Sequence, residues 1–197
     1  GNSTTYLGGL VGYFYATTTN SSTVAPGLIR TSYASGDVSL PSSATVGSFN
    51  YIYAGGLVGY LDGYSTTIGP AIADAYATGK VALDNAHGRL HAGGLVGYDY
   101  YQRITRAYAS GAVSALNGNT RASGGLVATG SSVSVTSSYW DSGATGQSAS
   151  IGGGTALTSA QMKQSSNFAG WSIRNTGVDT GETWRSYDGY TAPLLAG

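Results

Sequence analysis

A six-residue phrase occurs four times in this chain and constrains the fold more than any other feature. It reads Gly-Gly-Leu-Val-Gly-Tyr at residues 8–13, 55–60 and 93–98, and returns in altered form, Gly-Gly-Leu-Val-Ala-Thr, at residues 124–129. A fixed phrase separated by segments of variable length is typical of a solenoid, in which each unit buries its apolar face against its neighbours.

A second phrase, Tyr-Ala-Ser/Thr-Gly-x-Val, follows each of the first three copies, and Tyr139-Trp140 begins a decayed fourth version. Its tyrosine lies 25, 21, 15 and 15 residues after the first glycine of each unit. The basic unit is therefore about 31 residues, the distance from Gly93 to Gly124, and the earlier units carry insertions at 14–30 and 40–53. In a solenoid, such insertions leave the coil as loops.

The residue types favour strands over helices. Each glycine inside a helix would cost about 1 kcal/mol, and the phrases lack a 3.6-residue period. Short runs of Leu, Val, Tyr and Ile bounded by Gly and Ser indicate strands of about five residues. The sequence predicts an all-β fold, a β-solenoid resembling a parallel β-helix, with about four coils, loop insertions and a C-terminal cap that contains one short helix.

Equivalent side chains of successive coils should stack about 4.8 Å apart as ladders in the core. The expected leucine ladder is Leu10, Leu57, Leu95 and Leu126; the tyrosine ladder is Tyr33, Tyr76, Tyr108 and Tyr139; the valine ladder is Val38, Val81 and Val113. One equivalent site holds Asp37, Lys80 and Ala112, so it should face water. Strict alternation would put the tyrosines outside with that site. We therefore expect a bend at Ala-Ser/Thr-Gly that resets the alternation and buries them.

The glycine pairs are expected at corners of the coil. Glycine adopts positive φ at little cost, and it also lets backbones approach closely. The predicted corner glycines are Gly8, Gly9, Gly55, Gly56, Gly93, Gly94, Gly124 and Gly125.

The C-terminal part of the chain differs from the repeats, so we expect solenoid repeats at 1–145 and a capping segment of the same domain at 146–197. Thr158-Ser159-Ala160-Gln161 has the form of a capping box and predicts a short helix near 158–165. Aromatic and apolar residues follow, among them Phe168, Trp171 and Trp184. This segment should cover the open end of the last coil, which any solenoid must protect.

Charge and composition exclude several classes of partner. Nine basic and nine acidic residues, without clusters, argue against nucleic acid and anionic membranes. No apolar run approaches the roughly 20 residues of a membrane span. The absence of cysteine is compatible with export. The expected partners are other copies of the chain or the rest of a longer parent chain.

The two phrases together resemble the GLUG repeat. The run from Tyr139-Trp140-Asp141 through Gly152-Gly153-Gly154 to Gly170-Trp171 is similar to the segment that follows such repeats in filamentous-haemagglutinin-type adhesins. The resemblance implies a β-solenoid stalk of an exported bacterial surface protein, located outside the cell. GLUG repeats also occur beside metallopeptidase domains, but this sequence has no His-Glu-x-x-His motif, so that activity does not carry over.

Candidate chemical sites are few. Asp62 and Asp99 each follow a copy of the first phrase, and two carboxylates about 5 Å apart would suit a retaining glycosidase. We expect them to be polar turn residues instead, with no catalytic residue in the chain. His87 and His91 are expected to be solvated loop residues rather than zinc ligands. Asp-Gly at 62–63 and 188–189 is above all a turn signal, which leaves no predicted metal or cofactor and calcium only as a minor alternative.

Further tyrosines cluster around the first phrase and form a candidate surface for glycans or proteins, because tyrosine offers contact area and a hydroxyl. This surface comprises Tyr13, Tyr15, Tyr60, Tyr64, Tyr98, Tyr100 and Tyr101. The alternative is that these rings cover a thin core under the loops.

The strand expected at Thr4, Thr5, Tyr6 and Leu7 is a candidate association edge, since nothing before it looks like a cap. Three functions remain open: a structural or adhesive stalk, a subunit that stacks head to tail into a filament or matrix, and a polysaccharide-acting enzyme. A cleft with convergent carboxylates would favour the enzyme, and an N-terminal coil that docks on a neighbour would favour the filament.

Overall fold

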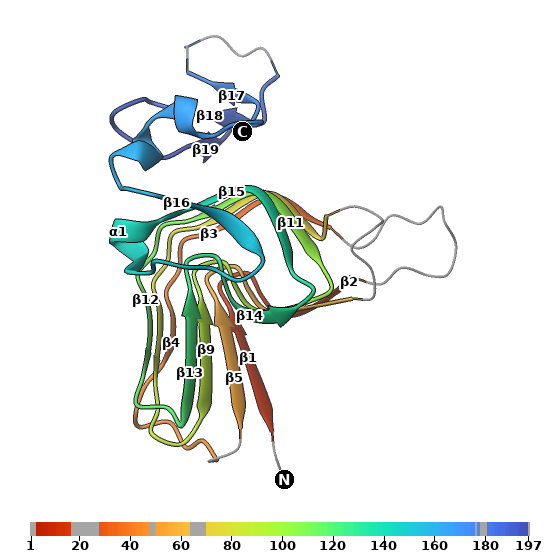
Figure 1. Cartoon of the computed structure of the whole chain (residues 1–197), viewed down its shortest axis with the longest axis vertical. Coiled ribbons are helices and arrows are strands. Elements are labelled where there is room, and N and C mark those ends of the chain that lie inside the picture. Colours follow the sequence, from red (N-terminus) through yellow and green to blue (C-terminus); the bar gives the residue numbers. More distant parts are fainter. Residues whose placement is uncertain are drawn as a thin grey trace, which may run out of the picture.

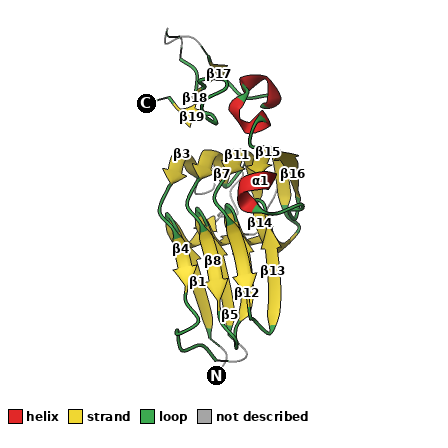
Figure 2. Ribbon diagram, turned by 90° about the vertical axis from the view of Figure 1, so that its left-hand side faces the viewer, coloured by secondary structure: helices red, strands yellow, loops and turns green. Residues whose placement is uncertain are grey.

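The computed structural model describes residues 3–16, 28–47, 50–63, 70–175, 177 and 181–196, and it is a β-solenoid of four stacked coils. Successive coils lie behind one another in Figure 1, and their strands lie side by side in Figure 2. The predicted parallel, repeat-based fold is confirmed.

The strands follow the repeated phrases. The first coil contains β1 (Thr4–Gly8), β2 (Val11–Ala16), β3 (Ile29–Ala34) and β4 (Val38–Leu40). The second contains β5 (Tyr51–Gly55), β6 (Val58–Gly63), β7 (Ile72–Ala77) and β8 (Val81–Asp84). The third contains β9 (Arg89–Gly93), β10 (Val96–Tyr100), β11 (Arg103–Ala109) and β12 (Val113–Leu116). The fourth contains β13 (Thr120–Gly124), β14 (Val127–Ser131), β15 (Ser134–Asp141) and the helix α1 (Ser142–Thr145).

Each position in the coil builds one parallel sheet. Sheet A has the order β1-β5-β9-β13, sheet B β14-β10-β6-β2 and sheet D β12-β8-β4. Sheet C has the order β16-β15-β11-β7-β3, because the additional strand β16 (Gly153–Leu157) joins β15. The repeated phrases are in register: the amide of Leu10 donates to the carbonyl of Leu57, that of Leu57 to Leu95, and that of Leu95 to Leu126.

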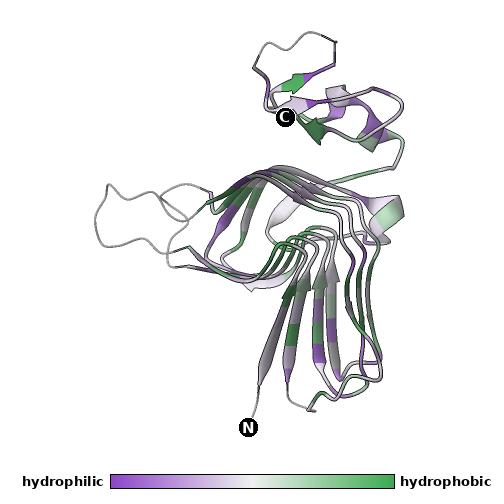
Figure 3. Cartoon of the chain, turned by 180° about the vertical axis from the view of Figure 1, so that it is seen from behind, coloured by the Kyte–Doolittle hydropathy of each residue, from purple (hydrophilic) through white to green (hydrophobic). Residues whose placement is uncertain are grey.

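Each coil is L-shaped, with two lobes that meet at the glycine pairs (Figure 1). Sheets A and D enclose the core of the lower lobe, and sheets B and C enclose that of the upper lobe. Hydrophilic and hydrophobic residues alternate along the strands of the lower lobe (Figure 3), as a two-residue period requires.

Leu57, Leu95 and Leu126 are fully buried in the upper core, but Leu10 is 48% exposed. The prediction that Leu10 is a core residue is therefore wrong for the described chain. The reason is its place in the first coil, where no described coil covers it. Val38, Val81 and Val113 are buried in the lower core, while Asp37, Lys80 and Ala112 are exposed.

The tyrosine ladder points out of the coil, which corrects the expected bend. Strict alternation runs from the buried Ala75 to the buried Val81, and Tyr76 lies outside between Ala75 and Ala77. The irregular residue comes before the tyrosine instead, at Asp74, whose φ is +52°. The equivalent residues of the other coils also have positive φ: Thr31 (+45°), Arg106 (+47°) and Ser137 (+44°).

The C-terminal segment buries these tyrosines from outside. It contains two short 3-10 helices (Gln161–Lys163 and Ser165–Asn167) and the small sheet β17 (Ile173–Arg174), β18 (Trp184–Arg185) and β19 (Leu194–Leu195). Tyr76, Tyr108 and Tyr139 form one cluster with Leu157, Met162, Phe168 and Trp184. Tyr33 lies beyond this cover and is 57% exposed, so its predicted place in the core is wrong.

The end of the last coil is covered by an earlier stretch than expected. β16 pairs with β15, and Ile151 donates its amide to Val127, so part of the predicted capping segment continues the solenoid. The capping box at Thr158 forms, since Thr158 and Gln161 exchange side chain to backbone hydrogen bonds, but it begins a 3-10 turn. The short α-helix lies at Ser142–Thr145 instead.

Close approach is the reason for the corner glycines. None of the eight predicted corner glycines, all of them described, has a positive φ. A Cβ on Gly56 would lie 2.2 Å from the carbonyl oxygen of Gly94 in the next coil. The other explanation offered by the sequence, positive φ, is therefore wrong at these positions.

Candidate functional site

Two tyrosine stacks lie on the outer faces of sheets A and B, where the two lobes meet. In sheet B, the ring centroids of Tyr13 and Tyr60 are 5.4 Å apart, and those of Tyr60 and Tyr98 4.7 Å. In sheet A, Tyr6 and Tyr53 are 6.2 Å apart, and Tyr53 lies 4.9 Å from the His91 ring. Tyr53 makes edge-on contacts with Tyr60 and Tyr98, which join the two stacks. We call this set of six side chains the tyrosine face.

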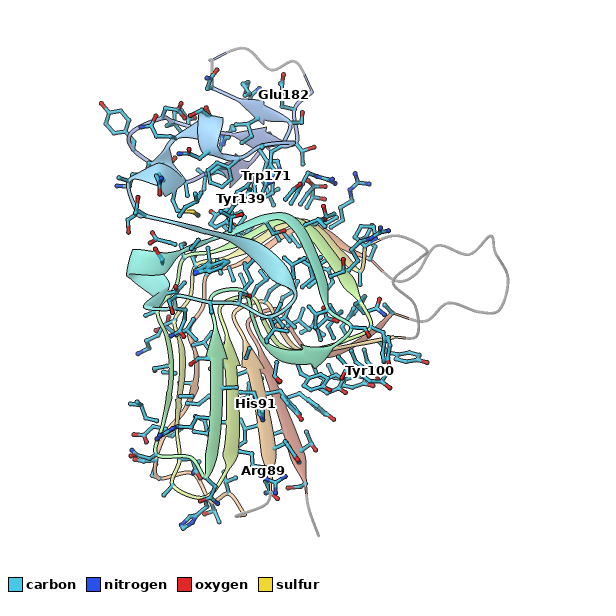
Figure 4. The ribbon with its side chains drawn as sticks, in the orientation of Figure 1. Arg89, His91, Tyr100, Tyr139, Trp171 and Glu182 are labelled. Atoms are coloured by element: carbon cyan, nitrogen blue, oxygen red, sulfur yellow. The ribbon has the colours of Figure 1, made fainter. Side chains whose placement is uncertain are left out.

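The tyrosine face brings together three of the predicted surface tyrosines: Tyr13, Tyr60 and Tyr98. Tyr100 and Tyr101 pack edge to face with each other, at 4.4 Å, and Tyr100 lies at the end of sheet B (Figure 4). Tyr15 is exposed, and Tyr64 lies outside the described residues. Tyr53 also belongs to the tyrosines that cluster around the first phrase. Tyr6 and His91 were predicted in other roles, as an edge residue and a loop residue, although all three lie four residues before the Leu-Val of a phrase.

The hydroxyls of Tyr13 and Tyr53 in the tyrosine face have pKa values above the ordinary value of tyrosine. The carboxylate of Asp62 accepts a hydrogen bond from the Tyr13 hydroxyl, which with burial raises the pKa of Tyr13 to about 12. Burial, followed by neighbouring tyrosines, raises the pKa of Tyr53 to about 12. The hydroxyls of Tyr13 and Tyr53 are therefore protonated at physiological pH.

His91 is buried beside Tyr53 and not in a solvated loop, which corrects the sequence-based expectation; His87 is exposed as expected. Burial, and then the charge of Arg89, lowers the pKa of His91 to about 4. Neither ring nitrogen has a hydrogen-bond partner among the described residues. His91 is thus a neutral ring that continues the aromatic stack (Figure 4).

Stacking limits what the tyrosine face can bind. Tyr60 and Tyr98 are nearly parallel, with an interplanar angle of 9°, so each covers a face of the other. Only ring edges and hydroxyls of the inner members remain for a ligand. Tyr6 and Tyr13 lie on β1 and β2, the outermost strands of sheets A and B, so both stacks end in the first coil.

The two candidate catalytic carboxylates lie on opposite sides of sheet B. Asp62 contacts Tyr13 on the outside, whereas Asp99 is fully buried in register with the core residue Leu61. Burial raises the pKa of Asp99 to about 8. One of its oxygens accepts the amide of Gln102 and closes a tight turn, while the other has no partner. The two carboxylates therefore do not form a glycosidase pair, and Asp99 closes a turn but is buried.

An acidic centre that sequence reasoning missed lies at Asp74 on the outer face of sheet C. Arg106 donates two hydrogen bonds to its carboxylate, at 2.6 and 2.8 Å, and Arg30 lies 3.6 Å away. Burial alone would raise the pKa of Asp74, but the hydrogen bonds from Arg106 and Trp184 hold it below its usual value. Asp74 thus joins three coils and the C-terminal segment.

The described residues contain no cluster of three or more potential metal ligands. In the predicted turn at 188–189, Asp188 accepts hydrogen bonds from Ser165 and Ser186. No described helix is long and apolar enough to span a membrane.

The predicted association edge forms as β1, the outermost strand of sheet A. Its residues Thr4, Thr5, Tyr6 and Leu7 pair with β5 on one side only. A cavity of about 440 Å³ opens beside it, between β1 and the start of β4. Gly8, Gly9, Gly12 and Gly36 line much of this cavity. The first-coil end, by which we mean β1 to β4 and this cavity, is therefore an uncovered cross-section of the solenoid.

Comparison with known proteins gives one match. Residues 50–82, which span almost the whole second coil, match the family model described as the GLUG motif. No curated protein and no solved structure matches the chain. The chain therefore carries a GLUG motif, which is a structural repeat type and not a known enzyme family.

Proposed function

We propose that this chain is a non-enzymatic structural module of an extracellular bacterial surface protein, and that its first-coil end receives another coil of the same kind. The GLUG motif in the second coil and the sequence resemblance to filamentous-haemagglutinin-type adhesins support this proposal. In such a protein the module lengthens a stalk, and its outer faces are available for adhesion.

The observation that carries the proposal is the state of the first-coil end. Leu10 occupies a position that is fully buried in the other three coils, yet it is 48% exposed. The core ladders and the hydrogen-bonding edges of β1 to β4 end there without cover in the described chain. A coil with the same phrases would continue every ladder in register.

A filament-forming subunit is the second candidate, because the lower lobe is also open at its other end. β13 is the last strand of sheet A and β12 the last of sheet D in the described chain. An open head-to-tail contact between such ends would build a filament. Polysaccharide cleavage, the third hypothesis, has no support from Asp62 and Asp99, which lie on opposite sides of sheet B.

Sedimentation with two matched variants tests the proposal. Thr5 is in register with the buried Ile52 and faces the lower core, whereas its neighbour Thr4 is exposed. Thr5→Lys places a charge where a further coil would pack, and Thr4→Lys adds the same charge outside. We expect concentration-dependent association of the wild-type chain that Thr5→Lys abolishes and Thr4→Lys retains. A wild-type chain that stays monomeric at high concentration, with the amides of residues 4–12 already protected from exchange, would contradict the proposal.

A further inference from the structure

A basic pocket lies on the outer face of sheet C, away from the tyrosine face. Its volume is about 320 Å³, within the lower range of small-ligand sites. The lining residues are Leu28, Arg30, Pro70, Ala73, Arg103, Thr105, Arg106 and Thr136. They come from four strands of sheet C, namely β3, β7, β11 and β15, and from Leu28 and Pro70, which shortly precede β3 and β7.

The register of sheet C builds the pocket. Arg30, Ala73, Thr105 and Thr136 are equivalent residues of the four coils and form one column across the strands. The small side chain of Ala73 leaves space in this column between Arg30 and Thr105. Arg106 comes from the adjacent column of positive-φ residues, and Arg103 lies two residues before the column.

Positive charge in the pocket exceeds negative charge. Three guanidinium groups line it, and the neighbouring carboxylate of Asp74 accepts two hydrogen bonds from Arg106 and forms an ion pair with Arg30 at 3.6 Å. Arg103 makes no side-chain ion pair or hydrogen bond with any described residue. The sequence segments 17–27 and 64–69, which precede Leu28 and Pro70 in the chain, contain no Asp or Glu. Among the described residues, three positive charges thus face one negative charge, and Arg103 is the guanidinium without a carboxylate partner.

The rest of the lining suits a sugar better than a bare ion. Thr105 and Thr136 offer hydroxyls for hydrogen bonds, and Leu28, Pro70 and Ala73 offer apolar contacts. A sugar ring presents hydroxyls and an apolar C–H face, whereas an inorganic anion needs only the arginines. Arg103 and Arg30 can hold a carboxylate through charge-assisted hydrogen bonds.

We propose that this pocket binds an acidic monosaccharide unit, a hexuronate, with its carboxylate at Arg103 and Arg30. The site would give the module a ligand that the proposed structural function does not require. Arg30 lies on β3, but the pocket extends along the outer face of sheet C over all four coils and does not use the cavity beside β1, so the two proposals can fail independently.

An NMR titration of the chain with glucuronate tests the site, since changes in amide chemical shifts detect weak binding. Glucose is the neutral control and inorganic sulfate the bare-anion control. Arg103→Gln removes a guanidinium that holds no described partner, so folding should be unaffected. Arg121→Gln makes the same charge change on β13, outside the pocket, and serves as the matched control variant.

Glucuronate is expected to shift the amides of Ala73 and Thr105, glucose to shift neither, and added salt to weaken the binding. Arg103→Gln should weaken it at least tenfold, and Arg121→Gln should leave it unchanged. Absence of glucuronate binding, or equal weakening by both variants, would overturn the proposal. Sulfate that binds as tightly as glucuronate at the same amides would overturn the assignment to a sugar.

Discussion

The indole Nε1 of Trp184 donates a hydrogen bond to Oδ1 of Asp74, at 3.3 Å and across 110 residues of sequence. This contact fixes the C-terminal segment to the second coil, while the Trp171 indole donates to the carbonyl of Ser137 in the fourth coil at 2.6 Å. Trp171 and Tyr139 face each other between the segment and sheet C (Figure 4), with ring centroids 5.9 Å apart. The segment is thus a lateral cover for the tyrosine ladder.

Trp184→Phe should therefore destabilise the chain by roughly 2–4 kcal/mol, because it removes a hydrogen bond to a buried carboxylate and leaves space in a packed cluster. Denaturant unfolding measures this loss. Tyr190→Phe, at a largely exposed ring of the same segment, is the control and should change stability little. Equal stability of the two variants would show that the segment is not held by this contact.

Gly79→Ala should destabilise the chain by about 1–3 kcal/mol, because its Cβ would lie 2.0 Å from the carbonyl oxygen of Gly36 in the first coil. Gly36→Ala is the matched control: it is the equivalent glycine of the first coil, and a Cβ there would meet nothing within 4 Å. Thermal melts of both variants would test the explanation by close approach, and an unaffected Gly79→Ala would contradict it.

Leu95→Asp tests the upper core. Leu95 is fully buried between the leucines of neighbouring coils, and a charge there has no described partner, so we expect a loss of more than 3 kcal/mol. Lys80→Asp, on the outer face, should cost less than 1 kcal/mol. If both variants lowered the melting temperature equally, the assignment of Leu95 to the core and Lys80 to the outer face would be wrong.

The buried carboxyl of Asp99 should make the free energy of unfolding fall as pH rises. Its pKa is raised to about 8 in the folded chain by burial, against about 4 when unfolded, so folding favours the protonated form. The stabilisation is complete below pH 4 and is lost between pH 4 and 8, by an amount on the order of 5 kcal/mol.

Asp99→Asn should remove this pH dependence, and Asp62→Asn should leave it in place, because Asp62 lies on the outside of the sheet. Unfolding free energies measured from pH 4 to 9 would decide. If the unfolding free energy of the wild-type chain changed with pH in parallel with that of Asp99→Asn, the proposed effect of the buried Asp99 carboxyl would be refuted.

The stacked coils could be predicted because the repeated phrases carry their own register. Leu57 and Leu95 recur at the same distance from the glycine pair, and parallel stacking of equal phrases leaves few other arrangements. Between Ala75 and Val81, strict alternation by itself gives which side chains face the core and which face outward. The prediction for Tyr76 was wrong because it assumed a bend that interrupts this alternation.

Other features depend on contacts that no local pattern contains. Tyr76 is outside the coil yet buried, because Trp184 and its neighbours pack over it from the far end of the sequence. Asp99 is buried because it occupies the inward-facing position that Leu61 fills in the second coil. Sequence periodicity does not give the path of the C-terminal segment.

An in-register extension tests the central claim, that the first-coil end is a surface for another coil. Thr4, Tyr51, Arg89 and Thr120 are equivalent in sheet A, so a copy of residues 89–119 joined directly before Thr4 should add one coil. The copied Gly111 would then lie over Gly36, as Gly36 lies over Gly79. The control is the same extension with Leu95→Asp in the copied segment.

The direct measurement is the change in melting temperature caused by Gly36→Ala in the original and in the extended chain. We predict that the extended chain melts higher than the original, that its control does not, and that Gly36→Ala, harmless in the original, lowers the melting temperature of the extended chain by several degrees. The claim that the first-coil end receives another coil would be contradicted if the extended chain had no higher melting temperature than the original and Gly36→Ala did not change that temperature.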